Sequence, residues 1–316
     1  MRRLWTWALS SLLLVDICHA QDTPAARPST QPAKQGAPQP VHFPSIAGPR
    51  QTTLDGYVFR AQGPGPHPAV VFLHGCGGLF NRQGAINSRE RDWAARLTSQ
   101  GISVLMVDSL RPRQHGEMCA PAHFDATIYR ARSFDAYAGL QYLQSQDFVQ
   151  PQSIGVIGWS QGGGALLDAI REGSAARPST LPSGDFSMAV GFYPASCSKK
   201  RQGGSWQSPV PLMVLIGDSD VWTVAKPCRE LIEAKDRNTR AEIHVYPGAY
   251  HDFDWPNLPV HEVPAFKTRA GVVPIEGANL EAMDDAVKRV TEFASVRLQQ
   301  SVATPEKTRS TMSSTP

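Results

Sequence analysis

The feature that most constrains the fold of this chain is a glycine-flanked serine, Ser160, in the run Gly158-Trp159-Ser160-Gln161-Gly162. A short apolar run with the length of a strand precedes it, and a helical pattern follows it. A serine in a strained strand-to-helix turn leaves no room for a Cβ two positions before or after it, which explains both glycines. Such a turn raises the serine hydroxyl above the sheet and directs the amide of Gln161 toward the place where a negative oxygen would form. The motif alone is a weak signal, so its meaning depends on the rest of the chain.

Apolar runs alternate with helical patterns along the chain, which predicts an α/β fold. Runs with the length of a strand lie at 52–60, 69–73, 102–107, 154–158, 186–193, 211–216 and 241–246. Helical periodicity recurs at 88–100, 126–145, 163–171 and 279–299. Nearly continuous apolar strands are typical of a mostly parallel sheet that helices cover on both faces. We therefore expect one domain over residues 47–299.

Both ends of the chain are expected to lie outside this domain. Residues 1–20 combine a basic start, an apolar stretch too short to span a bilayer and a small residue before Gln21, which is typical of a cleaved signal peptide. Residues 21–46 are rich in Pro, Ala, Gln and Ser and predict a disordered linker, and residues 300–316 predict a disordered tail. Export would place the protein in a bacterial periplasm or outside the cell, without stable membrane insertion after cleavage.

Charge and motif content argue against several kinds of partner. The formal net charge is +3 and no run is rich in Lys and Arg, so a nucleic-acid partner is not expected. The chain has no C-x-x-C or H-E-x-x-H spacing, so a zinc site has little support. We expect no metal or organic cofactor.

A serine, an acid and a histidine follow three different apolar runs. Ligands in open α/β sheets bind beyond the carboxyl ends of the strands, where Ser160, the pair Asp218 and Asp220, and His251 would meet. The chain order Ser, Asp, His is that of an α/β-hydrolase triad. Ser160 is the expected nucleophile and His251 the base that removes its proton. Either aspartate lies in the right loop to orient the imidazole.

The turn His74-Gly75-Cys76 follows another apolar run and is expected to complete an oxyanion hole. The two donors would be the backbone amides of Cys76 and Gln161. Only their backbones are needed, so the side chains are free to vary. We interpret His74 as a structural hydrogen-bonding residue rather than as a second base.

Four residues are candidates for substrate contact. Arg111 and Arg113 lie in the loop after the run 102–107, where they could bind a carboxylate or simply be solvated surface charges. Trp159 and Trp222 flank the triad, and core packing is an equally good interpretation of each.

The chain resembles the dienelactone hydrolase family of α/β-hydrolases in four segments: V-F-L-H-G-C-G-G, V-I-G-W-S-Q-G-G-G, L-I-G-D-S-D-V-W-T and Y-P-G-A-Y-H-D-F-D. With the closing helix, the resemblance covers roughly residues 52–298. The family pattern places the acid three residues after the strand-ending glycine, which favours Asp220. The namesake enzymes use a cysteine nucleophile where this chain has Ser160, although the family also has serine members. The resemblance implies a small-molecule ester or lactone substrate.

The cysteines that would remain after export are expected to pair. Cys76 and Cys119 follow what should be neighbouring strands of this fold, and Cys197 and Cys228 also lie beyond successive strands. An oxidising compartment favours disulfides, so we expect the pairs Cys76–Cys119 and Cys197–Cys228.

These features favour an exported serine hydrolase that cleaves carboxylic esters through an acyl-enzyme. The run Gly158 to Gly164 also resembles polyester hydrolases of the cutinase kind, but those lack a His-Gly turn after the third strand. A peptidase of the same fold is another alternative. The last alternative is a non-catalytic exported binding protein. A protein that only binds its ligand has no need for a serine, an acid and a histidine at the strand ends.

Overall fold

The computed structural model describes residues 36–46, 48–204 and 206–299. The expected signal peptide, most of the expected linker and the expected tail lie outside the described residues.

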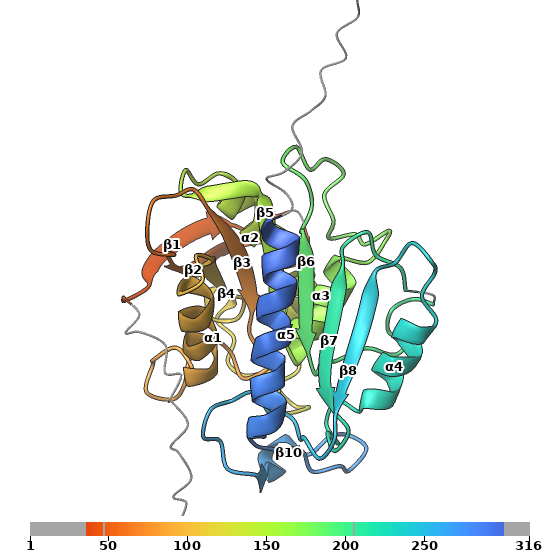
Figure 1. Ribbon diagram of the computed structural model, residues 1–316. Helices are drawn as coiled ribbons and strands as arrows, with labels where there is room; N and C mark the ends of the chain where they lie inside the picture. Colours follow the sequence, from red (N-terminus) through yellow and green to blue (C-terminus); the bar gives the residue numbers. More distant parts are fainter. Residues whose placement is uncertain (1–35, 47, 205, 300–316) are drawn as a thin grey trace, which may run out of the picture. The chain divides into compact units, whose positions relative to one another are not determined.

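An eight-stranded sheet in the order β1-β2-β4-β3-β5-β6-β7-β8 forms the centre of the domain (Figure 1). The two pairings that involve β2 are antiparallel, and all pairings from β4 to β8 are parallel. This confirms the mostly parallel sheet of an α/β fold. The strands are β1 (Gln39–Pro44), β2 (Thr53–Phe59), β3 (His67–Leu73), β4 (Ser103–Asp108), β5 (Val149–Trp159), β6 (Met188–Phe192), β7 (Leu212–Gly217) and β8 (Ala241–Tyr246).

The strands β4, β6 and β7 are buried along their whole lengths, because helices cover both faces of the sheet. Figure 1 shows α1 and α5 on the near face and α2 and α3 on the far face. Asp125 begins α2 by accepting hydrogen bonds from the amides of Thr127 and Ile128. Within the described ranges, no helix is both long and apolar enough to cross a membrane. The helices are α1 (Ser88–Thr98), α2 (Ala126–Gln144), α3 (Gln161–Ala169), α4 (Ala225–Glu233) and α5 (Leu280–Gln299).

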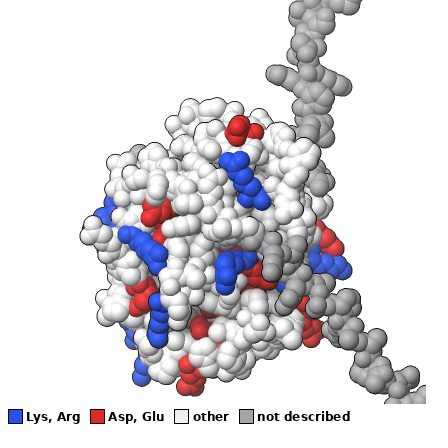
Figure 2. All heavy atoms as spheres, turned by 90° about the vertical axis from the view of Figure 1, so that its left-hand side faces the viewer, with Lys and Arg blue, Asp and Glu red and all other residues white. Residues whose placement is uncertain are grey.

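Smaller elements complete the chain. A two-stranded sheet of β9 (His261–Glu262) and β10 (Ile275–Glu276) lies in the segment between β8 and α5. Short 3₁₀ helices span Arg111–Arg113 and Pro264–Phe266. Figure 2 shows basic and acidic side chains scattered among uncharged residues on one face of the molecule.

Apart from these smaller elements, β1 and α4 differ from the sequence prediction. The expected linker reached residue 46, but Gln39–Pro44 forms β1, so that prediction was wrong at its end. Phe43 is buried there and stacks on Tyr142 with ring centroids 4.9 Å apart, a distant contact that composition does not reveal. The helix α4 was not predicted from the sequence, and Pro227 is its third residue. Proline is tolerated in a first turn, where the amide has no helical partner.

The turn between β5 and α3 is as tight as the sequence predicted. Ser160 has φ 51° and lies between the strand and the helix. A Cβ at Gly158 would lie 2.5 Å from the carbonyl oxygen of Gly162. A Cβ at Gly162 would lie 2.1 Å from the carbonyl oxygen of Leu73, at the end of the neighbouring strand β3. Backbone contact with β3 therefore requires glycine at position 162.

We expect Gly162→Ala to lower the free energy of unfolding by about 3 kcal/mol or more, because backbone atoms have to move to admit the methyl group. Denaturant unfolding measures the change. Gly77→Ala is the matched control, since a Cβ there would meet nothing within 4 Å. Its change should stay below about 0.5 kcal/mol. Equal stabilities of the two variants would contradict the close approach of the turn to β3.

Candidate active site

The structure brings Asp220 and His251 together beyond the ends of β7 and β8. His251 Nδ1 lies 2.7 Å from Asp220 Oδ2, and both residues are buried. Asp220 also accepts hydrogen bonds from the amides of Trp222 and Thr223, each at 2.8 Å. Asp218 is exposed and instead accepts a hydrogen bond from the amide of Gly248 at 2.7 Å. Of the two candidate acids, Asp220 is the one in contact with the histidine.

The pKa shifts of this pair favour an ionised Asp220 and make His251 a stronger base than an ordinary histidine. Burial acts to lower the pKa of His251, but the charge and hydrogen bond of Asp220 outweigh burial and leave the pKa raised. Burial acts to raise the pKa of Asp220, but His251 and the Thr223 donors outweigh burial and leave the pKa lowered. Such a pair increases the basicity of the histidine and fixes its orientation.

The backbone around Ser160 is held from two sides. The amide of Ser160 donates to the carbonyl oxygen of Phe192 at 3.0 Å, and its own carbonyl accepts from the amides of Gly164 and Ala195. Tyr193, the residue after Phe192, packs on His251 with ring centroids 4.4 Å apart. The end of β6 therefore lies next to both the serine and the histidine. Within the described part of the chain, the Ser160 hydroxyl donates no hydrogen bond to His251; such catalytic contacts often tighten only in the complex with substrate.

The turn after β3 is rigid around the expected oxyanion donor Cys76. His74 Nδ1 lies 2.7 Å from the carbonyl oxygen of Gly75, and His74 Nε2 accepts from the amide of Ser109 at 3.3 Å. Burial, followed by the charge of Arg132, lowers the pKa of His74 well below its ordinary value, so this ring is neutral. His74 therefore has the geometry of a structural hydrogen-bonding residue.

Both expected disulfides are present, and both lie beside the site. Cys76 is bonded to Cys119 and Cys197 to Cys228, with Cα atoms 4.9 and 4.7 Å apart. The first joins the turn after β3 to the loop before α2. The second joins the loop after β6 to α4, which begins just beyond Asp220.

The expected second donor is Gln161, the first residue of α3. The first amides of a helix have no partner within the helix, so this one is free to bind an anion. The side chain of Gln161 donates from Nε2 to the carbonyl oxygen of Met118 at 3.0 Å.

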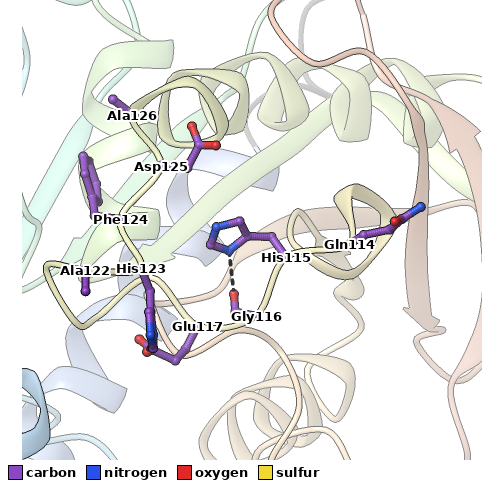
Figure 3. A pocket seen from close by; sticks show the side chains of 9 residues that line it. All are labelled: Gln114, His115, Gly116, Glu117, Ala122, His123, Phe124, Asp125 and Ala126. Atoms are coloured by element: carbon purple, nitrogen blue, oxygen red, sulfur yellow. Dashed lines mark hydrogen bonds and ion pairs between the residues drawn. The ribbon is translucent and has the colours of Figure 1, made fainter.

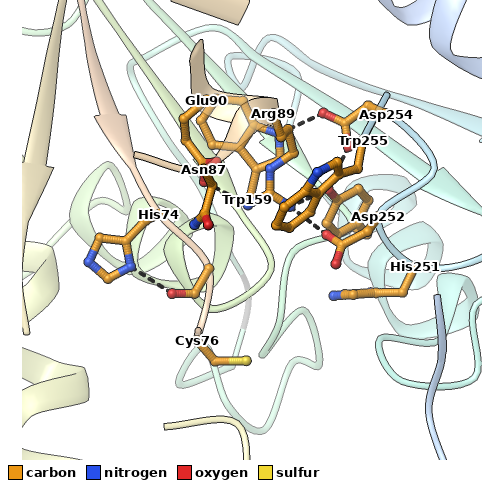
Figure 4. A network of polar contacts seen from close by, with 12 residues as sticks. His74, Cys76, Asn87, Arg89, Glu90, Trp159, His251, Asp252, Asp254 and Trp255 are labelled. Carbon is orange, nitrogen blue, oxygen red and sulfur yellow. Dashed lines mark hydrogen bonds and ion pairs between the residues drawn. The ribbon is translucent and has the colours of Figure 1, made fainter. Parts of the chain in front are cut away.

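A buried polar network, which the sequence analysis missed, lies behind the histidine (Figure 4). Asp254 accepts hydrogen bonds from Trp93 Nε1, Trp159 Nε1 and the Tyr193 hydroxyl. Arg89 binds both Asp252 and Glu90. These contacts fix the segment that follows His251. The acids at positions 252 and 254 were a local signal of it, but these partners lie 61 to 163 residues away along the chain.

Two of the four candidate substrate contacts are wrong. Trp159 is completely buried and donates to Asp254, so its ring is inside the core. Arg113 is buried in a bidentate pair with Asp135, with both distances 2.8 Å. Arg111 is exposed, and its guanidinium lies 3.6 Å from the centroid of the Phe80 ring. Trp222 is half-buried, packs on His251 and lines a cleft.

That cleft has a volume of about 570 Å³ and lies directly beside the expected triad. Its walls include one cysteine from each disulfide together with the oxyanion candidate Gln161. The aromatic, amide and basic residues that line it include Phe124, Gln161, Arg201, Trp222, Phe266 and Arg269.

A second hollow has a volume of about 870 Å³ (Figure 3). It lies along the loop between β4 and α2 and is lined in part by His115, Glu117, His123 and Asp125. His123 forms an ion pair with Glu117, and His115 contacts the carbonyl oxygen of Gly116. In the part of the chain that the structure describes, no group of three or more His, Cys, Asp or Glu residues is arranged to hold a metal ion.

A mostly parallel sheet with serine, aspartate and histidine after β5, β7 and β8, in that chain order, is typical of an α/β-hydrolase fold. Comparison with known proteins narrows this class, because the model of the dienelactone hydrolase family matches residues 54–296. The chain belongs to this family.

Individual relatives are distant. YtaP of Bacillus subtilis, named as a hydrolase, is 32% identical over 111 residues, which cover 31% of this chain and 37% of that protein. This chain thus spans little more than a third of that relative. A Bradyrhizobium protein named as a 2-oxo-3-(5-oxofuran-2-ylidene)propanoate lactonase is 24% identical over 62% of this chain and 77% of its own length.

Two solved structures share the fold. A Klebsiella pneumoniae protein described as a dienelactone hydrolase has a TM-score of 0.55 and 16% identity, over 82% of this chain and 99% of its own. Esterase 2 of Thermogutta terrifontis has a TM-score of 0.56 and 17% identity, over 84% of this chain and 96% of its own.

The contact between Asp220 and His251 predicts how the histidine titrates. Asp220→Asn removes the charge that raises the pKa of His251, so burial should then dominate and the pKa should fall. An NMR titration of the imidazole signals measures this. Asp218→Asn is the matched control and should leave the pKa raised. A pKa that is unchanged in Asp220→Asn, or lowered equally in both variants, would contradict this assignment.

Proposed function

We propose that the protein is a serine hydrolase that cleaves carboxylic esters or lactones through an acyl-enzyme on Ser160. The observation that carries this proposal is the buried Asp220–His251 pair beside the Ser160 turn, at the carboxyl end of a parallel sheet. Membership of the dienelactone hydrolase family supports it.

In the proposed mechanism, Nε2 of His251 takes the proton of Ser160 while the serine oxygen attacks the substrate carbonyl. The amides of Cys76 and Gln161 bind the negative oxygen of the tetrahedral intermediate. His251 then gives its proton to the departing alcohol, which leaves the acyl group on Ser160. A water molecule, deprotonated by His251, attacks this acyl group and releases the acid and free Ser160. Asp220 stabilises the imidazolium in each half of the cycle.

The cleft beside the triad supports a substrate that combines an apolar part with a negative charge. Phe124, Trp222 and Phe266 supply aromatic surface, whereas Arg201 and Arg269 supply positive charge. Among the described residues that line the cleft, none is acidic. The Bradyrhizobium relative is named for a propanoate lactone, a substrate of this type. We therefore propose an anionic ester or lactone as the natural substrate class.

We also propose that the protein works in an oxidising compartment, the bacterial periplasm or the outside of the cell. The two disulfides support this, because such bonds persist in oxidising environments and are rare in the cytosol.

Replacement of the proposed nucleophile tests the mechanism directly. Ser160→Ala should lower kcat for a short-chain nitrophenyl ester at least about 10,000-fold, because the covalent step is lost. Ser145→Ala, at an exposed serine after α2, is the matched control and should keep full activity. Equal activity of the Ser160→Ala variant and the wild type would exclude the mechanism.

The pH dependence follows from the shifted pKa of His251. The base acts in its neutral form, so activity should rise with pH as the histidine loses its proton. Because Asp220 raises the pKa of His251, the midpoint of kcat/KM should lie above that of an ordinary histidine. An activity that falls with rising pH over this range would contradict a histidine base.

The cleft arginines can be tested by the charge of the substrate. The double variant Arg201→Gln/Arg269→Gln should raise KM about fivefold for a nitrophenyl ester of a dicarboxylic acid, because two exposed attractions are lost. KM for the neutral butyrate ester should not change. Arg237→Gln/Arg240→Gln alters the net charge equally at exposed sites outside the cleft and should affect neither substrate. An equal KM change with both esters would contradict recognition of an anion.

A further inference from the structure

We propose that Arg132 is a positioning residue of the oxyanion hole: its buried guanidinium ties together the two segments that carry the oxyanion donors. This inference rests on the proposed function, in which Cys76 and Gln161 supply those donors. Arg132 belongs to α2 and is not among the residues that directly follow a strand in the sequence.

The side chain of Arg132 contacts both segments at once. It is completely buried. Its NH2 group donates a hydrogen bond to the carbonyl oxygen of His74, in the turn that carries Cys76. Its NH1 group donates to Gln161 Oε1 at 3.3 Å. A single rigid guanidinium fork therefore spans the end of β3 and the start of α3.

Further contacts close a ring around these two donors. Gln161 Nε2 donates to the carbonyl oxygen of Met118 at 3.0 Å, and the amide of Met118 donates to the carbonyl oxygen of Cys76 at 2.8 Å. The Cys76–Cys119 disulfide joins the same two segments next to this backbone bond. The ring thus runs from Arg132 through Gln161 and Met118 to Cys76, and back through the turn to the carbonyl of His74.

The orientation of the Cys76 amide follows from the neutral state of His74. A trans peptide unit is planar, so the amide of Cys76 points opposite to the carbonyl of Gly75. His74 Nδ1 donates to that carbonyl, while His74 Nε2 accepts from the amide of Ser109. This pattern requires one proton on the ring, at Nδ1. Burial, followed by the positive charge of Arg132, disfavours a second proton on the His74 ring and so preserves the pattern.

Arg132 differs from the neighbouring buried arginines because no carboxylate among the described residues is paired with its charge. Arg89 pairs with Glu90 and Asp252, and Arg113 pairs with Asp135. Within the described ranges, Arg132 forms no ion pair with a carboxylate; its Nε, like that of Arg89, has no hydrogen-bond partner. Burial lowers its pKa to about 10. A buried cation without a paired acid is costly to stability, and a negative oxygen forming in the adjacent hole would be stabilised by it.

Kinetics on Arg132→Lys and Arg132→Met test the proposal. The lysine has one compact charged group that cannot span both segments, and the methionine removes the charge. We expect kcat for a short-chain ester to fall about 10-fold in Arg132→Lys and about 100-fold in Arg132→Met, with KM within about twofold of the wild type. The affinity for a trifluoromethyl ketone, whose adduct carries an oxyanion, should fall in parallel with kcat.

Arg113→Lys is the matched control, because it alters another buried guanidinium of the same region, whose hydrogen bonds go to Asp135 and to the carbonyl oxygens of Ser109 and Arg50 rather than to His74 or Gln161. It should lower the melting temperature but leave kcat and the ketone affinity unchanged. If Arg132→Lys behaves in the same way, Arg132 is only a structural residue and the proposal is wrong.

Gln161→Met decides the question even if the Arg132 variants do not fold. It keeps the backbone amide but removes the side-chain contacts with Arg132 and Met118. We expect kcat to fall about 10-fold. In the double variant Arg132→Met/Gln161→Met, the loss should be smaller than the product of the single losses. Unchanged kcat in Gln161→Met would overturn the proposal. A wild type without esterase activity would instead overturn the proposed function on which it rests.

Discussion

The close approach of the β5–α3 turn to the end of β3 is the constraint on which the rest of the site depends. Gly162 lies so near the carbonyl oxygens of Leu73 and His74 that no side chain fits between them. Parallel pairing brings Leu73 level with Gly158, so the serine turn and the His74-Gly75-Cys76 turn leave the sheet at the same height. Pairing of Trp159 with Phe192 brings the end of β6 to that height as well. The proposed nucleophile and oxyanion donors thus meet because the strands are in register.

Buried polar groups and disulfides fix the loops around the site, which the pairing of the strands does not fix by itself. Asp254 and Arg89 anchor the segment after His251 to α1 and to the end of β6. Buried charges of this kind seldom increase stability over well-packed apolar residues, so their contribution here is to geometry. The disulfides close loops with sequence separations of 43 and 31 residues, which corresponds to about 4 kcal/mol each from the reduced entropy of the unfolded chain. Each disulfide also contributes one cysteine, Cys119 or Cys197, to the wall of the proposed substrate cleft.

Much of this arrangement could be predicted from the sequence, because its signals are local. Apolar runs mark the strands, glycines mark the tight turn, and the residues after each run mark the site. Long-range contacts left no such signal. Phe43 orders β1 through a distant tyrosine, Trp159 is drawn into the core by Asp254, and Arg113 pairs with Asp135 instead of meeting solvent. The contacts of Arg132 with His74 and Gln161 are of the same kind, since its place in a helical pattern says nothing about them.

Covalent labelling of the proposed nucleophile tests the central claim most directly. The protein would be treated with a fluorophosphonate, which forms a stable adduct with activated serines, and then analysed by intact-mass measurement and peptide mapping. The mechanism predicts one adduct per chain, located on Ser160, and greatly slowed labelling in His251→Ala, because the serine then lacks its base. No adduct, an adduct on another residue, or labelling at full rate in His251→Ala would contradict the mechanism.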